Sequence, residues 1–209
     1  MACWLAAVAI LGLGGWGIYY APGCGAPPID VALSQWFEQQ RTDSADRMFR
    51  TITWLGSAIV LVPLVTVGMV ILVFCRRICE AYFLGVSLLG TIAIMHLSKF
   101  TIARPQPMEV NALIGMPSDP SFPSAHSAQI ASVMLAGLVV SARYRRSWSI
   151  GLLPFALLLI ALVGVSRVYL KVPYPSDVIA GIVVGALCVA GLAFWMFPRS
   201  TVRQGGDAQ

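Results

Sequence analysis

Charged side chains are scarce in this sequence. Lys, Arg, Asp and Glu make up 11% of the 209 residues, whereas hydrophobic residues make up 58% and the mean hydropathy is +0.80. A soluble globular domain typically carries about 25% charged residues. The scarcity of charge therefore excludes a water-soluble globule and predicts an integral membrane protein.

Other features are also missing. The sequence has no internal repeat and no soluble appendage beyond a short tail at 199–209, which we expect in the cytoplasm. Its five cysteines form no disulfide framework, and Cys75 and Cys79 lack the additional ligands that a metal site needs. The sequence therefore predicts a single membrane domain over 1–209, with no cofactor and no metal.

Six apolar runs are present that could each cross a bilayer, which requires about 20 mainly apolar residues. They cover residues 3–20, 52–74, 81–98, 127–142, 148–166 and 177–197. No Lys or Arg precedes the first run, which favours a retained helix over a cleaved signal peptide. The expected fold is an all-α, polytopic bundle of six transmembrane helices.

The net charge of +5 and the pI near 9.2 do not indicate a nucleic-acid partner. The basic residues lie at the ends of spans, as membrane topology predicts, and not on one polar face. Arginines follow the second, fourth and sixth spans, at positions 76, 77, 143, 145, 146, 199 and 203. We therefore expect both termini in the cytoplasm and the alternate loops outside. The compact size favours a bacterial inner membrane with those loops in the periplasm.

The first outer loop, residues 22–50, becomes compatible with a helix from Ile29 onwards. Apolar residues then recur on one side, at positions 31, 33, 36 and 37. This pattern predicts an amphipathic helix at the bilayer surface. Packing of this helix on the bundle is favoured over a gating role.

Three polar clusters fall on the outer side under this topology. They are residues 99–107 after the third span, 122–126 before the fourth, and 166–177 between the fifth and sixth. Ionisable residues at membrane depth are costly and usually mark a site or a pathway. Isolated basic residues would only extend to lipid headgroups, but three clusters on one face favour a functional anion site.

The chemistry of these clusters indicates phosphate. Lys99, Arg104, Arg167 and Lys171 supply positive charge, and arginine binds phosphate oxygens bidentately. The cluster at 122–126 adds the start of a helix, where backbone N–H groups and the helix dipole favour an anion.

Within the second cluster, Ser124, Ala125 and His126 directly precede an apolar helix. His126 is placed to donate a proton to a leaving oxygen. The alternative is that this histidine only caps the helix.

These clusters resemble the three signatures of the type-2 phosphatidic acid phosphatase family. The third signature, Ser-Arg, five residues, His, three residues, Asp, is similar to residues 166–177, with Pro173 at the histidine position. The second, Pro-Ser-Gly-His, is similar to residues 123–126, with Ala125 for Gly. The first, Lys, six residues, Arg-Pro, is similar to residues 99–107, with Gln106 at the fixed arginine. The resemblance covers residues 30–195.

The resemblance implies a role for each matching residue. Lys99, Ser124 and Arg167 would bind phosphate, and His126 would protonate the leaving group. Asp177 would orient the nucleophilic histidine, which forms a phosphohistidine in this family. The resemblance also implies the helical bundle and a lipid phosphate as ligand.

Two differences from the family signatures argue against the phosphohistidine mechanism. Pro173 has no nucleophilic side chain, and loss of a covalent nucleophile can lower a rate by about 10⁶-fold. Gln106 replaces a phosphate-binding arginine, although Arg104 stands two residues before it. The other histidine, His96, is an alternative nucleophile, but a hydrogen-bonded structural role is favoured for it.

Two functions remain open. The favoured one is a non-catalytic relative that recognises a lipid phosphate or a protein partner. The alternative is an active phosphatase or phosphotransferase with a non-standard mechanism, for which Asp177 and His126 are the nearby bases. A transporter is disfavoured, since broken helices and paired repeats are missing.

A site at headgroup level suits glycerolipid, polyprenyl and sphingoid phosphates or pyrophosphates alike. A homo-oligomer also stays open.

Overall fold

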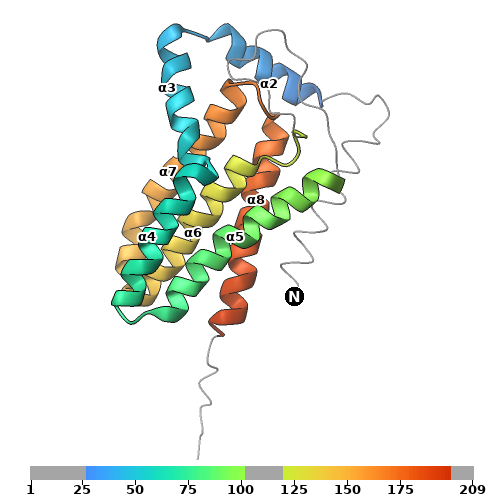
Figure 1. The fold of residues 1–209 in the computed structure, drawn as a ribbon. Helices are drawn as coiled ribbons and strands as arrows, with labels where there is room; N and C mark the ends of the chain where they lie inside the picture. The colour runs from blue at the N-terminus through green and yellow to red at the C-terminus, as the bar shows by residue number, and fades with distance from the viewer. Residues whose placement is uncertain (1–26, 102–119, 199–209) are drawn as a thin grey trace, which may run out of the picture.

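The computed structural model of the chain describes residues 27–101 and 120–198. These residues are all-helical, as the composition predicted. In chain order the elements are α2 (Pro28–Gln39), α3 (Asp43–Thr53), the 3₁₀ turn η1 (Trp54–Gly56), α4 (Ala58–Phe74), α5 (Ile78–Thr101), α6 (Ala125–Tyr144), α7 (Arg146–Tyr169) and α8 (Pro175–Met196). Helices α4 to α8 form a bundle, and α2 and α3 extend beyond one of its ends (Figure 1).

The predicted spans are largely confirmed where the structure describes them. Helices α5, α6, α7 and α8 are each long and apolar enough to cross a membrane. The predicted span 52–74 is divided instead, since α3 with η1 meets α4 at an angle of 47°, and this bent pair counts as a fifth candidate. The predicted span 3–20 lies outside the described residues, so the count of six stays a prediction.

The bend before α4 has a local cause. Ser57 is extended, and its side chain accepts a hydrogen bond of 3.3 Å from the Ile59 backbone N–H, which begins α4. The preceding turn packs closely on the bundle, because a Cβ added to Gly56 would lie 2.7 Å from Val163 Cγ1 and 3.0 Å from the His126 carbonyl oxygen. The bend therefore lies directly beside the start of α6.

Helix α6 is central, with α5, α7 and α8 packed around it. Two glycines allow α8 to approach the first turns of α6. A Cβ added to Gly181 would lie 2.4 Å from the Ser124 carbonyl oxygen, and one added to Gly185 would lie 2.4 Å from that of Ala128. Small residues at a four-residue spacing permit such close contact between membrane helices. The approach fixes the start of α6 against α8.

The helix predicted from Ile29 onwards is present as α2 and packs on the bundle, as favoured, whereas its place at the bilayer surface stays a prediction. Asp30 is buried and accepts hydrogen bonds from the backbone N–H and the hydroxyl of Ser176, at 3.0 and 2.6 Å. Phe37 packs edge-on against Tyr169. Most of the apolar residues of α2 remain exposed: Ile29, Val31, Leu33 and Trp36. The helix is thus held by a buried carboxylate, one aromatic ring and an ion pair from Glu38 to Lys171, while most of its apolar side chains stay exposed.

Candidate functional site

A cavity of about 240 Å³ lies between the start of α6 and the ends of α5 and α7. Since a ligand-sized pocket spans about 300–1,000 Å³, this cavity suits a headgroup better than a whole lipid. Fifteen residues line it: Ser57, Ala58, Met95, His96, Lys99, Pro120, Ser121, Pro123, Ser124, Ala125, His126, Gln129, Arg167, Val172 and Pro173. Residues from all three predicted polar clusters therefore meet in one place.

Arg167 supplies a buried positive charge. It lies in the last turn of α7, and the residue is only 9% exposed. Its Nη1 donates a hydrogen bond of 3.3 Å to the hydroxyl of Thr53, whereas its Nε has no hydrogen-bond partner among the described residues. A buried guanidinium is costly unless its donors are satisfied. The vacant donor therefore indicates that an anion completes this part of the cavity.

The start of α6 forms the second side of the site. The Ser124 backbone N–H donates to the carbonyl oxygen of Asp177 at 3.1 Å, so this group is committed to the α8 contact. The Ser124 side chain does not cap α6 and is hydrogen-bonded to the Ser127 hydroxyl at 2.9 Å. The N–H groups of Ala125 and His126 follow in the first turn, where the helix dipole favours an anion.

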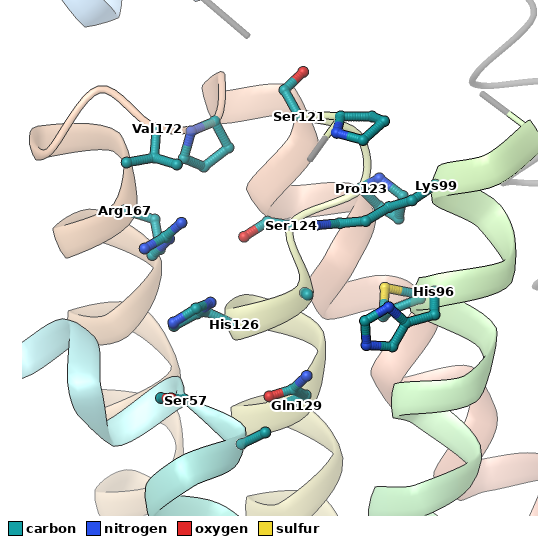
Figure 2. A pocket seen from close by; sticks show the side chains of 15 residues that line it. Ser57, His96, Lys99, Ser121, Pro123, Ser124, His126, Gln129, Arg167 and Val172 are labelled. Atoms are coloured by element: carbon teal, nitrogen blue, oxygen red, sulfur yellow. The ribbon is translucent and has the colours of Figure 1, made fainter. Parts of the chain in front are cut away.

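The side chains converge from separate helices. His126 and Arg167 lie at successive levels on one side of the cavity, and Lys99 extends from α5 toward Ser124 on the other (Figure 2). Two cationic side chains and a half-buried imidazole thus face a shared space. This arrangement suits a phosphate group with its oxygens toward the cations.

Pro173 lines the same cavity as His126 and Arg167. The position that the family resemblance assigns to the nucleophile is therefore at the site, but it presents a saturated ring. Proline offers neither a nucleophilic atom nor a proton to exchange.

Asp177 is fully buried and is not among the residues that line the cavity. Its Oδ2 accepts a hydrogen bond of 3.0 Å from the Tyr174 backbone N–H, as part of a capping box at the start of α8. In this structure its carboxylate therefore stabilises a helix start next to the site. Its predicted catalytic role stays a prediction.

Lys171 corrects the predicted set of cations. Its side chain is 2% exposed, and its Nζ lies 2.9 Å from Oε2 of Glu38 on α2. The residue adopts a left-handed backbone with φ of 55°, in the turn after α7. Lys171 is not among the residues that line the cavity, so its charge is directed to α2. The sequence could not show this, because Glu38 lies 133 positions before it.

Three residues near the site carry no signal in the sequence patterns. Gln129 lines the cavity, and its Oε1 has no partner among the described residues. Ser57 lines it from the bend before α4, and Thr53 holds Arg167 from the end of α3. Only tertiary packing brings the 53–57 segment beside α7. Gln129 lies three residues after His126, a spacing that places both on one side of a helix.

Some predicted features cannot be placed. Arg104 and Gln106 lie outside the described residues. Within the described ranges, no group of three or more His, Cys, Asp or Glu side chains is arranged to hold a metal ion.

The geometry brings buried and half-buried basic side chains to one cavity at one end of a bundle of membrane-length helices. The chain belongs to the PAP2 superfamily, whose family model matches residues 80–201. Curated protein sequences gave no match.

Two solved structures share the fold. A transmembrane PAP2-type phosphatidylglycerolphosphate phosphatase from Bacillus subtilis has a TM-score of 0.81 and 23% identity, covering 97% of this chain and 100% of its own. LpxE from Aquifex aeolicus has a TM-score of 0.65 and 22% identity, covering 79% of this chain and 95% of its own. At these identities the likeness concerns the fold.

Proposed function

We propose that this protein binds the phosphate or pyrophosphate group of a membrane lipid without hydrolysing it through a phosphohistidine. The observation that carries the proposal is the cavity in which Arg167 has a vacant buried donor while Pro173 occupies the nucleophile position. Binding needs the cations and the start of α6, and both are present. Covalent catalysis needs a nucleophilic side chain at position 173, and that side chain is missing.

The ligand follows from the place of the cavity. It lies at one end of helices that are long enough to cross a membrane, which supports a ligand whose phosphate lies at headgroup level, and its volume suits a headgroup. Glycerolipid, polyprenyl and sphingoid phosphates share this chemistry. The family relationship supports a lipid phosphate, since one fold relative is a phosphatidylglycerolphosphate phosphatase. We place the site on the periplasmic side of a bacterial inner membrane, with both termini in the cytoplasm.

A second candidate function is an active phosphatase or phosphotransferase with a different mechanism. The observation that favours it is that His126, the expected proton donor, lines the same cavity as Arg167. In that mechanism the oxygen of water or of an acceptor hydroxyl would attack the phosphorus directly and give its proton to His126, and His126 would pass a proton to the leaving oxygen as its bond to phosphorus breaks. Asp177, the other base that the sequence offered, is used in the capping of α8.

The experiment that separates the two functions measures phosphate release and lipid binding together. The purified full chain is incubated with a panel of lipid phosphates and pyrophosphates, and Arg167→Ala serves as the matched control. We expect Arg167-dependent binding and no release. Release that disappears in Arg167→Ala would establish the second function, and binding that survives this substitution would remove the anion site.

A gain-of-function variant tests the role of position 173. Pro173→His combined with Gln106→Arg restores the two signature residues that this sequence lacks. If only these residues are missing, the double variant should release phosphate where the wild type does not. A folded but inactive double variant would show that the cavity has diverged further.

A further inference from the structure

Gln129 is a buried amide inside the cavity that the phosphate chemistry does not use. It lies in the second turn of α6, is 6% exposed, and its Oε1 has no hydrogen-bond partner among the described residues. It lies one turn beyond His126, deeper in the bundle than Arg167 and Lys99 (Figure 2). The cavity therefore has a second unsatisfied polar group, of opposite character to the first.

The two vacant groups require different partners. The Nε of Arg167 is a donor and calls for an anionic oxygen, whereas the Oε1 of Gln129 is an acceptor and calls for an O–H or N–H. A phosphate oxygen satisfies the first and is repelled by the second. A bare phosphate group therefore leaves the deeper part of the cavity unsatisfied, and buried polar groups without partners are rare in native structures.

The other residues that line the cavity do not supply the missing donor. Met95 and Ala58 are apolar, and the ring of His96 makes no hydrogen bond to the Oε1 of Gln129. The Ser57 hydroxyl oxygen accepts a hydrogen bond from the Ile59 backbone N–H. The Ser57 hydroxyl does not donate to Gln129, because the Oε1 of Gln129 has no hydrogen-bond partner among the described residues. A side chain kept only for packing at this position would be apolar, because an unsatisfied amide destabilises a buried wall.

The size of the cavity leaves room for more than phosphate. A single water molecule requires roughly 10–15 Å³ of such cavity space, so the cavity of about 240 Å³ is many times larger than one water molecule needs. A phosphate group with four oxygens fills part of this space. Gln129 lines the same cavity, so a few more non-hydrogen atoms of the same headgroup can reach it.

We propose that Gln129 is a specificity-determining residue that accepts a hydrogen bond from a free hydroxyl beside the phosphate of the lipid. The ligand class is a phosphorylated lipid whose headgroup or backbone keeps a hydroxyl close to the phosphate. Polyprenyl phosphates and fully acylated glycerol phosphates lack such a hydroxyl and bind less tightly. This inference rests on the proposed lipid-phosphate binding and narrows its ligand.

The test compares two lipids that differ in one hydroxyl. The probes are 1-oleoylglycerol 3-phosphate and its 2-deoxy analogue, 1-oleoyl-1,3-propanediol 3-phosphate. The two lipids have the same charge and the same acyl chain. Their dissociation constants are measured for the full chain in nanodiscs of phosphatidylcholine. The wild type should prefer the hydroxylated lipid about tenfold, the range for one additional hydrogen bond at a buried acceptor.

Gln129→Met keeps the length of the side chain and removes its acceptor. In this variant the preference should fall below twofold, and the deoxy lipid should bind at least as tightly as to the wild type. Ser132→Ala is the matched control on the same helix. Its hydroxyl is buried and donates to the Ser87 carbonyl oxygen at 2.9 Å, outside the cavity, so its loss should leave the preference intact.

The outcomes separate this inference from the proposed function. Equal binding of the two lipids by the wild type, with binding still dependent on Arg167, overturns the inference alone and would mean that a water molecule satisfies Gln129. This comparison needs no variant, so it holds even if Gln129→Met fails to fold. A tenfold preference that survives in Gln129→Met also overturns it. Failure of both lipids to bind overturns the proposed function itself.

Discussion

The two ends of the bundle both bury charged groups, but they satisfy them differently. At the end where α4 meets α5, Glu80 accepts hydrogen bonds of 3.1 Å from Arg77 and from Arg143. Both guanidinium groups also stack on aromatic rings at 3.9 Å, those of Tyr144 and Phe197. At the opposite end, Arg167 donates to a neutral hydroxyl and retains a vacant donor, and Gln129 beside it retains a vacant acceptor.

This difference indicates what each end does. A carboxylate bound by two arginines is satisfied within the chain and needs no ligand. A cavity with unsatisfied groups of both kinds is costly to the fold, and such violations of local rules occur mainly at functional sites. The difference supports a structural role for the Glu80 end and the proposed binding of a ligand at the Arg167 end.

Removal of the buried charge at the site should have the largest effect on lipid binding. Arg167→Met should weaken the binding of a phosphorylated lipid by about 1.5–3 kcal/mol, the range for hydrogen bonds to a charged group, or about 10- to 150-fold. The same variant should be as stable as the wild type or more stable, because an apolar residue of similar length removes an incompletely paired buried charge. Dissociation constants and thermal unfolding in detergent measure the two effects.

Arg167→Lys is the control for charge without the planar fork, and it should retain part of the affinity. If Arg167→Met lowered the stability and left the affinity unchanged, the arginine would be structural and the two ends would be alike.

At the Glu80 end we expect a substitution to lower stability and to leave lipid affinity unchanged. Glu80→Gln should lower the free energy of unfolding by about 1–2 kcal/mol, since Arg77 and Arg143 lose their negative partner at a side chain that is 7% exposed. Lipid affinity should not change. Glu38→Gln makes the same chemical change at a half-exposed carboxylate and should cost less. A loss of lipid affinity in folded Glu80→Gln would show that the two ends are coupled.

How far the sequence predicts this molecule depends on the range of the interactions. Helices α5 to α8 follow from long apolar runs, because composition alone decides whether a segment enters a membrane. The bend at Ser57 was not predicted, because apolar residues continue on both sides of it, and the break follows from local capping and packing against α6.

In the site too, local motifs were predicted correctly and tertiary contacts were not. The local motifs brought Ser124, His126 and Arg167 to one cavity as expected. Gln129 and Thr53 were missed, because their importance depends on helices that meet only in the folded chain. The assignment of Lys171 to the site failed for the same reason, since its partner Glu38 lies on α2.

Thr53 offers a finer test of the site end, because it touches Arg167 without being among the residues that line the cavity. Thr53→Val keeps the shape and removes the hydroxyl, so the guanidinium loses its anchor. We expect lipid affinity to fall by about 0.5–1.5 kcal/mol, the net value of one hydrogen bond. Thr53→Ser should restore it, which a role in packing alone would not predict. Titration of each folded variant with the same lipid measures the effect, and equal affinities in all three would remove Thr53 as a positioning residue.

The smallest expected effect concerns the ion pair that connects α2 to the turn beside the site. The hydrogen bond from the Lys171 ammonium lowers the pKa of Glu38 below its ordinary value of 4.5. Because the pKa is lowered in the folded protein, the contribution of this pair to stability is complete above pH 4.5 and is lost as the pH falls through the folded value. The melting temperature of the wild type should therefore drop slightly more between pH 6 and pH 3 than that of Glu38→Gln, which lacks the titrating group. Parallel pH profiles for the two proteins would mean that the pair does not stabilise α2. Such a result would leave the hydrogen bonds from Ser176 to Asp30 as the contact that holds α2 against the start of α8.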